Sequence, residues 1–98
     1  MLGFDQLDKA FESRVRLGVM SVLMVNEWVN YGELKDILSL TDGNLASHIT
    51  ALEKIEYVAV RKQFVGKKPL TSYQVTEKGR KAFTEHLDAL EKLIKSGR

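Results

Sequence analysis

Apolar residues recur with a helical period along the first part of the chain. Phe4, Leu7 and Phe11 are spaced i, i+3 and i+7, which predicts a short amphipathic helix near the start. A second helix is expected over residues 14–26, because Ser13 favours the N-cap position just before it. This second segment is apolar on nearly all sides, which is typical of a helix buried in the middle of a small domain.

Two further helices are predicted, with a short break between them. Residues 33–38 form two helical turns, and residues 39–41 interrupt the pattern. Thr41 is a good N-cap for the next helix, which is expected to run to about Ile55. Its core-facing side carries Leu45, Ile49 and Leu52. Two helices joined by so short a break must cross, and this arrangement is a helix-turn-helix.

The period changes from 3.6 to 2 after these helices. Residues 57–64 and 71–75 are rich in aromatic and β-branched side chains, which predicts two strands. Residues 65–69 between them are expected to form the tip of a hairpin, with Pro69 ending the pairing on one side. Residues 30–32, ahead of the helix-turn-helix, fit either a turn or a very short strand.

A long helix is expected at the end of the chain, over residues 77–95, with Thr76 as its N-cap. The element order is then helix, helix, helix, hairpin, helix. The length of 98 residues fits one domain, spanning 1–98. The predicted fold class is mainly α with a small β-hairpin (α+β), a winged helix-turn-helix with a three-helical core, a wing and a long C-terminal helix.

Composition narrows the possible classes of protein. The chain has no cysteine, so it has neither a disulfide framework nor a thiolate metal site. Its first ten residues lack the basic-then-apolar pattern of a secretory signal. Its most apolar stretch, residues 15–29, is interrupted by polar residues and is too short to cross a bilayer. We therefore expect a cytoplasmic protein with no membrane partner.

Charge is distributed unevenly along the chain. The net charge is only +2, yet residues 54–81 hold eight basic side chains against Glu56 and Glu77, which makes this stretch +6 and the remainder −4. The basic residues are Lys54, Arg61, Lys62, Lys67, Lys68, Lys78, Arg80 and Lys81. A positive middle on an otherwise acidic chain suits a polyanionic partner. The alternative at this point is an ordinary solvated run of charges.

The helix after Thr41 carries the first candidate binding face. Opposite its apolar side lie Gly43, Ser47, Thr50 and Lys54, with Asn44, His48 and Ala51 at the flanks. Short hydrogen-bonding side chains can reach base edges or phosphates, and a recognition helix inserts such a face into the major groove. The candidate DNA-binding residues of this helix are Thr41, Asn44, Ser47, His48, Thr50 and Lys54. The alternative is a plain polar surface helix.

The hairpin carries the second candidate binding face. Arg61, Lys62, Lys67 and Lys68 load it with positive charge, and no acidic residue lies between Tyr57 and Thr76. Basic side chains on a protruding ribbon can contact phosphates beside a groove. The alternative is an edge ribbon that lysines protect against aggregation.

The last helix carries a candidate dimer interface. Phe83, Leu87, Leu90 and Ile94 are spaced by four, three and four residues, which resembles a heptad seam. A helix of this length has more apolar edge than a small core can cover, which favours pairing with a second copy of the chain. The alternative is that the helix folds back onto the N-terminal helix of its own chain, and the two readings are compatible.

Several segments together resemble a known family. They are residues 16–20 (RLGVM), 43–49 (GNLASHI) with Leu52-Glu53, 64–69 (FVGKKP), 71–73 (TSY) and 75–80 (VTEKGR). They are similar to the compact winged-helix transcriptional regulators related to the MarR and ArsR families, over nearly the whole chain. The resemblance implies a dimer that binds DNA, with Asn44, Ser47 and His48 facing DNA and Lys67 and Lys68 at the wing tip.

The chain departs from the metal-sensing members of the ArsR group. Those members use cysteines or clusters of histidine and carboxylate, whereas this chain has only His48 and His86 in different helices. We expect no metal or other cofactor, although an intersubunit site involving His86 with Glu85 or Asp88 remains an alternative. The chain is near the minimal length of the family, so the sequence does not predict a small-molecule effector.

The motifs also indicate whether an enzyme or a binding protein is expected. No nucleophile–base pair, glycine-rich phosphate loop or metal-ligand spacing is present, so an enzyme is not expected. The predicted function is a homodimeric, sequence-specific regulator of transcription that binds a near-palindromic operator in double-stranded DNA, acting as a repressor. The alternative is a winged-helix module that binds protein without binding DNA, since fold alone does not decide between the two.

Overall fold

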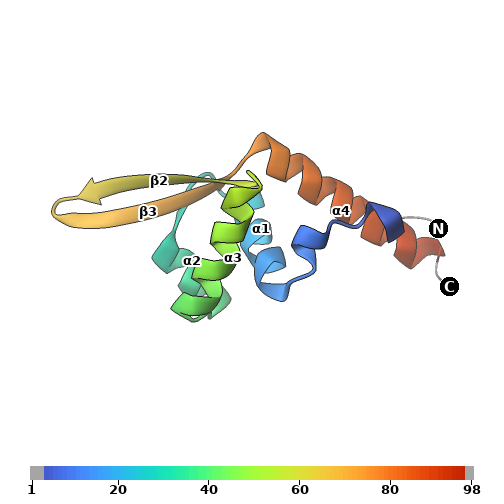
Figure 1. Cartoon of the computed structure of the whole chain (residues 1–98), viewed down its shortest axis with the longest axis horizontal. Coiled ribbons are helices and arrows are strands. Elements are labelled where there is room, and N and C mark those ends of the chain that lie inside the picture. The colour runs from blue at the N-terminus through green and yellow to red at the C-terminus, as the bar shows by residue number, and fades with distance from the viewer. Residues whose placement is uncertain (1–3, 97–98) are drawn as a thin grey trace.

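The computed structural model of the chain describes residues 4–96 and shows a winged helix-turn-helix (Figure 1). Its helices are α1 (Arg14–Met24), α2 (Tyr31–Leu38), α3 (Asp42–Lys54) and α4 (Glu77–Ser96); its strands are β1 (Val29–Asn30), β2 (Val58–Val65) and β3 (Lys68–Val75); and two 3₁₀ turns, η1 (Phe4–Gln6) and η2 (Lys9–Phe11), precede them. The β2–β3 wing and α4 project in opposite directions from the helical body, so the molecule measures 55 × 25 × 21 Å. The predicted fold class is confirmed.

Helix starts follow from capping side chains, as the sequence predicted. The hydroxyl of Ser13 accepts a hydrogen bond from the Arg16 amide at the start of α1, and that of Thr41 accepts one from the Asn44 amide at the start of α3. Thr76 caps α4 by accepting from the Gly79 amide. Each cap satisfies one of the amide groups that the first turn of a helix leaves unpaired.

The start of α2 differs from the prediction by two residues. Asn30 and Glu33 form a reciprocal capping box, in which each side chain accepts a hydrogen bond from the backbone amide of the other. The helix therefore begins at Tyr31, and the very short strand that was one of the two expectations for residues 30–32 is β1, at residues 29–30.

The core is built around α1, as its all-round apolar pattern predicted. Val19, Met20 and Leu23 are fully buried there. Gly18 allows α2 to approach closely, because a methyl group at this position would lie only 3.0 Å from the Leu38 Cδ2 atom. The other large, fully buried side chains come from η2, α2 and α3: Phe11, Leu34, Leu45 and Leu52.

The predicted amphipathic helix near the start of the chain is wrong. The chain instead makes the two turns η1 and η2, and the carboxylate of Asp8 starts η2 by accepting from the Ala10 amide. Asp8 is held in place by residues far along the chain. Its amide donates to Nδ1 of His86 at 3.0 Å, and the hydroxyl of Tyr57 donates to its Oδ2 at 2.6 Å. These contacts fix the backbone in a conformation that a continuous helix would not allow.

Phe11 is the main apolar anchor of this N-terminal segment. Its ring stacks on Tyr57 with centroids 5.5 Å apart and meets Phe83 edge-on at 5.1 Å. The ring of His86 also meets it edge-on, at 5.2 Å. The segment is thereby packed against the first half of α4.

The sheet is antiparallel with strand order β1-β3-β2. β3 begins at Lys68, three residues earlier than predicted, and Pro69 lies inside the ladder opposite Phe64. Pro69 is tolerated because β1 pairs only with Ser72 and Tyr73, which leaves the other edge of β3 free near the tip. The hairpin turn itself is Gly66-Lys67, with Gly66 at φ +65°.

Within residues 4–96, no helix combines the length and the apolar character that crossing a lipid bilayer requires.

Candidate nucleic-acid interface

The exposed face of α3 carries most of the polar side chains that the sequence predicted for it. Leu45, Ile49 and Leu52 are buried on the opposite side. The exposed set comprises Thr41, Gly43, Asn44, Ser47, Thr50 and Lys54. A methyl group added at Gly43 would meet no atom within 4 Å, so the backbone is openly accessible at the first turn of α3.

Of the residues predicted for the DNA-binding face of α3, His48 is the one that is not fully exposed. It is half-buried, and its Nδ1 atom accepts a 3.0 Å hydrogen bond from Nε of Arg16 in α1. Because a guanidinium only donates, the neutral imidazole must carry its proton on Nε2. Arg16 is further fixed by a 3.5 Å contact from its Nη1 to the carbonyl of Ala10. His48 is therefore tied to α1 and presents one defined donor, Nε2–H.

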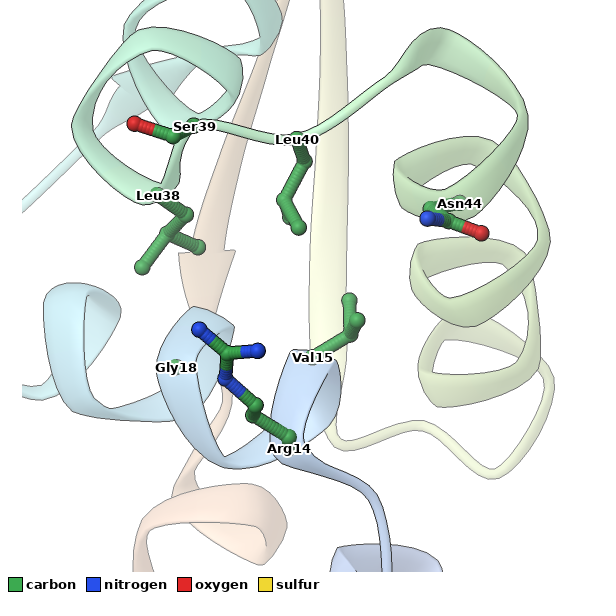
Figure 2. Close-up of a pocket in the computed structure, with 7 residues that line it drawn as sticks. All are labelled: Arg14, Val15, Gly18, Leu38, Ser39, Leu40 and Asn44. Carbon is green, nitrogen blue, oxygen red and sulfur yellow. The ribbon is translucent and has the colours of Figure 1, made fainter.

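A groove of about 450 Å³ runs between α1 and the start of α3. It is lined by Arg14, Val15, Gly18, Leu38, Ser39, Leu40 and Asn44. Figure 2 shows the guanidinium of Arg14 reaching from α1 toward the α2–α3 turn, with Asn44 on the far side of the groove. Arg14 was not predicted from the sequence as a candidate site residue. Its only sequence signal is its position at the start of a helix, and only the fold shows that it faces α3.

A second, wider groove lies at the other end of the same flank of α3. It has a volume of about 690 Å³, and its basic lining residues are Lys9, Arg16, Lys54 and Lys78. The ring of Tyr57 lies among them, with Nζ of Lys78 5.8 Å from its centroid. Burial, followed by the hydrogen bond to Asp8, raises the pKa of Tyr57 to about 12, so the phenol stays neutral beside these cations.

The wing divides its basic residues between its two faces. Lys62 lines a groove shared with Tyr31 and with Ala46 of α3, so it lies on the face that looks toward α3. Neighbouring residues in a strand point to opposite faces. Arg61 accordingly lies on the other face, where its guanidinium stacks 4.2 Å from the ring centroid of Trp28. The sequence grouped these two residues, and the structure separates them.

At the wing tip, Lys67 is in the turn and Lys68 opens β3, and both are exposed. Cations therefore stand on both sides of the polar face of α3. The α1 side has Lys9, Arg14, Arg16, Lys54 and Lys78, and the wing side has Lys62, with Lys67 and Lys68 at the wing tip.

The apolar seam predicted on α4 divides into a buried and an exposed part. Phe83 is 3% exposed and packs on Phe11 of its own chain, so its assignment to the dimer interface is wrong. Leu87 and Ile94, two helical turns apart on one side of α4, are 45% and 74% exposed, and Leu90 between them is half-buried. The fold-back alternative thus holds for the first half of α4, while an exposed apolar stripe remains along the second.

His86 takes part in the core of the domain. Its ring is buried and its Nδ1 atom is occupied by the amide of Asp8. Among residues 4–96, no three histidine or carboxylate side chains lie close enough together to hold a metal ion.

Comparisons with known proteins agree with this geometry. Residues 15–94 match the family described as "Winged helix DNA-binding domain". An uncharacterized protein of Methanocaldococcus jannaschii is 34% identical over 88 residues, which cover 90% of this chain and 96% of that protein.

Solved structures share the whole fold. A transcriptional regulator homologue from Pyrococcus horikoshii superposes with a TM-score of 0.77 at 28% identity, covering 94% of this chain and 96% of that one. A regulator of the MarR family from Porphyromonas gingivalis has the same fold at 20% identity, with a TM-score of 0.69 and coverage of 92% and 86%. The chain belongs to the winged-helix DNA-binding domain family and has the fold of the MarR and ArsR transcriptional regulators.

Proposed function

We propose that the protein is a sequence-specific regulator of transcription that binds double-stranded DNA as a homodimer. One observation carries the proposal: the exposed polar face of α3 is bordered on both sides by cations. Short polar side chains suit base edges, and flanking cations suit the two phosphate backbones that border a groove. The residues in contact with DNA would be Thr41, Asn44, Ser47, His48, Thr50, Lys54, Lys62, Lys67 and Lys68, together with Arg14.

Arg61 has a more limited part in this proposal. Its guanidinium already stacks on the ring of Trp28, whereas Lys67 and Lys68 stand exposed at the wing tip. We therefore propose that it stabilises the base of the wing and contributes to the positive field, while Lys62, Lys67 and Lys68 contact phosphates directly.

The exposed stripe of Leu87, Leu90 and Ile94 on α4 supports a two-fold dimer. In such a dimer the two α3 helices would enter successive major grooves about 34 Å apart, and the operator would be near-palindromic. We propose that the bound dimer represses transcription by blocking polymerase, that it acts in the cytoplasm, and that it works by binding alone, without catalysis.

Fluorescence anisotropy with labelled duplex DNA tests the proposal. Mixed genomic fragments are titrated with protein at about 50 mM and about 200 mM salt. We expect measurable binding, with log K falling against log salt by about 0.9 for each phosphate contacted. Selection from a random duplex library then yields the operator, which should be enriched for two related half-sites about 10 base pairs apart.

The contrary outcome is equally clear. If no duplex binds at about 50 mM salt, then the cations beside α3 serve solubility alone. The protein-binding alternative would then be favoured, and immobilised protein would be used to search for a partner.

A further inference from the structure

The wing ends in two large apolar side chains that the rest of the molecule leaves uncovered. Phe64 is 76% exposed and Val65 is 63% exposed, and both directly precede the Gly66-Lys67 turn. Such exposure is unfavourable in water for an aromatic ring of this size. Figure 1 shows that this end of the wing is the point farthest from the helical body on its side. No other element among residues 4–96 lies near enough to cover it.

The two side chains point in opposite directions. Phe64 lies opposite Pro69 and shares the face of Lys62, which looks toward α3; Val65 lies opposite Lys68 on the other face. They therefore do not form one continuous apolar patch of the size that marks a protein-binding site. A thin ribbon with an apolar side chain on each face fits a narrow slot with two walls.

The charge around the two side chains indicates which kind of groove would accept the wing tip. Lys62, Lys67 and Lys68 surround them, and the sequence from Tyr57 to Thr76 contains no acidic residue. The minor groove of duplex DNA is about 6 Å wide, with deoxyribose walls and phosphates along both rims. Phe64 would pass between the sugar walls while the lysines reach the phosphates. Proteins that enter this groove often insert an apolar wedge between two base pairs, which kinks the duplex.

We propose that Phe64 is such a wedge: it enters the minor groove beside the major groove read by α3, partly unstacks one base step and bends the operator. Its partner across the ladder, Pro69, has a fixed φ and stiffens the strand opposite the wedge. Unstacking is easiest at pyrimidine–purine steps, so such a step should recur at the position that Phe64 reaches in each half-site. This inference rests on the proposed function and adds a second element of sequence preference to it.

The test uses the full chain and the operator obtained by selection. Donor and acceptor dyes at the two ends of the duplex report bending by energy transfer, and 2-aminopurine placed at successive steps reports unstacking. Wild-type protein should raise energy transfer and should brighten 2-aminopurine at one step in each half-site. Phe64→Ala should lose both signals and bind about tenfold more weakly, and Phe64→Leu should retain part of each.

Two controls separate the possible outcomes. Val65→Ala removes the apolar side chain on the other face and should leave the bend unchanged, and thermal melts should show that both variants stay folded, since both side chains are exposed. If wild-type protein binds the operator but leaves it straight and stacked, or if Phe64→Ala bends it equally, then the wedge is refuted while DNA binding stands. If wild-type protein binds no duplex, then the proposed function fails and the wedge fails with it.

Discussion

The Nε atom of Arg16 in α1 donates a 3.0 Å hydrogen bond to Nδ1 of His48 in α3, across 32 positions of sequence. This contact couples the helix at the centre of the core to the helix that carries the proposed reading face. It also fixes the ring nitrogen that carries the proton, because only an unprotonated Nδ1 can accept from a guanidinium. The imidazole therefore keeps Nε2–H as a donor, which in the proposed complex would meet an acceptor on DNA.

If Arg16 acts by orienting His48, then the two residues contribute to DNA affinity as one unit. We expect Arg16→Ala and His48→Ala each to weaken binding, and the double variant to lose less than the sum, with a coupling of about 1 kcal/mol. Anisotropy titrations of the four proteins on one operator measure this coupling. Strictly additive losses would show that Arg16 contacts DNA independently of His48.

The two predicted binding faces should differ in what they contribute. Lys67→Glu together with Lys68→Glu should weaken binding to every duplex and flatten the dependence of log K on log salt, because we propose that these residues contact phosphates. Asn44→Ala should instead reduce discrimination between operator and unrelated DNA by about 1–3 kcal/mol. Titrations on operator and scrambled duplexes at several salt concentrations separate the two effects. An equal loss on all sequences for Asn44→Ala would refute its role as a reader of bases.

Alanine substitution at two glycines should change the free energy of unfolding in opposite directions. A methyl group at Gly79 would overlap the backbone carbonyl of Tyr57, which is itself held by the amide of Thr76. Gly79→Ala should therefore lower the free energy of unfolding by about 3 kcal/mol. Gly43→Ala meets open space and should raise it, by up to about 1 kcal/mol, through helix propensity. Urea unfolding followed by circular dichroism measures both values, and similar stability of the two variants would contradict the prediction.

The exposed stripe on α4 predicts a dimer that charge can disrupt. Leu87→Glu together with Ile94→Glu should convert the protein to a folded monomer, since both positions are open to solvent in the single chain. Sedimentation at micromolar concentration measures the mass. Lys92→Glu is a matched control, because residue 92 lies on the other side of α4 from residue 94. A monomeric wild-type protein at this concentration would remove the basis for the dimer.

Tyr57 predicts a specific loss of stability in alkali. Its pKa is raised from 10.0 to about 12 by burial and by its hydrogen bond to Asp8, so the folded chain holds the phenolic proton more tightly than the unfolded chain. This contribution is fully present below pH 10 and is lost as the pH rises from 10 to 12. Urea midpoints at pH 9, 10 and 11 should fall more steeply for wild-type protein than for Tyr57→Phe. Burial also raises the pKa of Tyr73, so some dependence should remain in the variant.

Much of the fold was predictable because its signals are local. Ser13, Thr41 and Thr76 lie next to the amide groups they cap, so a few neighbouring residues suffice to place three helix starts. The change of hydrophobic period after residue 56 similarly marks where helix gives way to strand. The polar face of α3 follows from the same periodicity, because burying one side of a helix exposes the other.

Failures of prediction arose where distant residues compete with local preference. The spacing of Phe4, Leu7 and Phe11 fits a helix, yet contacts of Asp8 with Tyr57 and His86 hold the backbone in two short turns. The tertiary contacts supply hydrogen bonds and aromatic packing that a short isolated helix could not provide, since such helices are marginal in water.

The sequence by itself determined the order of the elements, the polar face of α3 and the positive charge of the wing, because each depends on residues close together in the chain. Only the tertiary structure decided that Phe83 is buried by Phe11, that Arg61 stacks on Trp28 and that Arg16 orients His48. Charge and hydrophobicity are properties of single residues. Which partner each side chain meets depends on how the elements pack against one another. The periodicity of the sequence does not specify this packing.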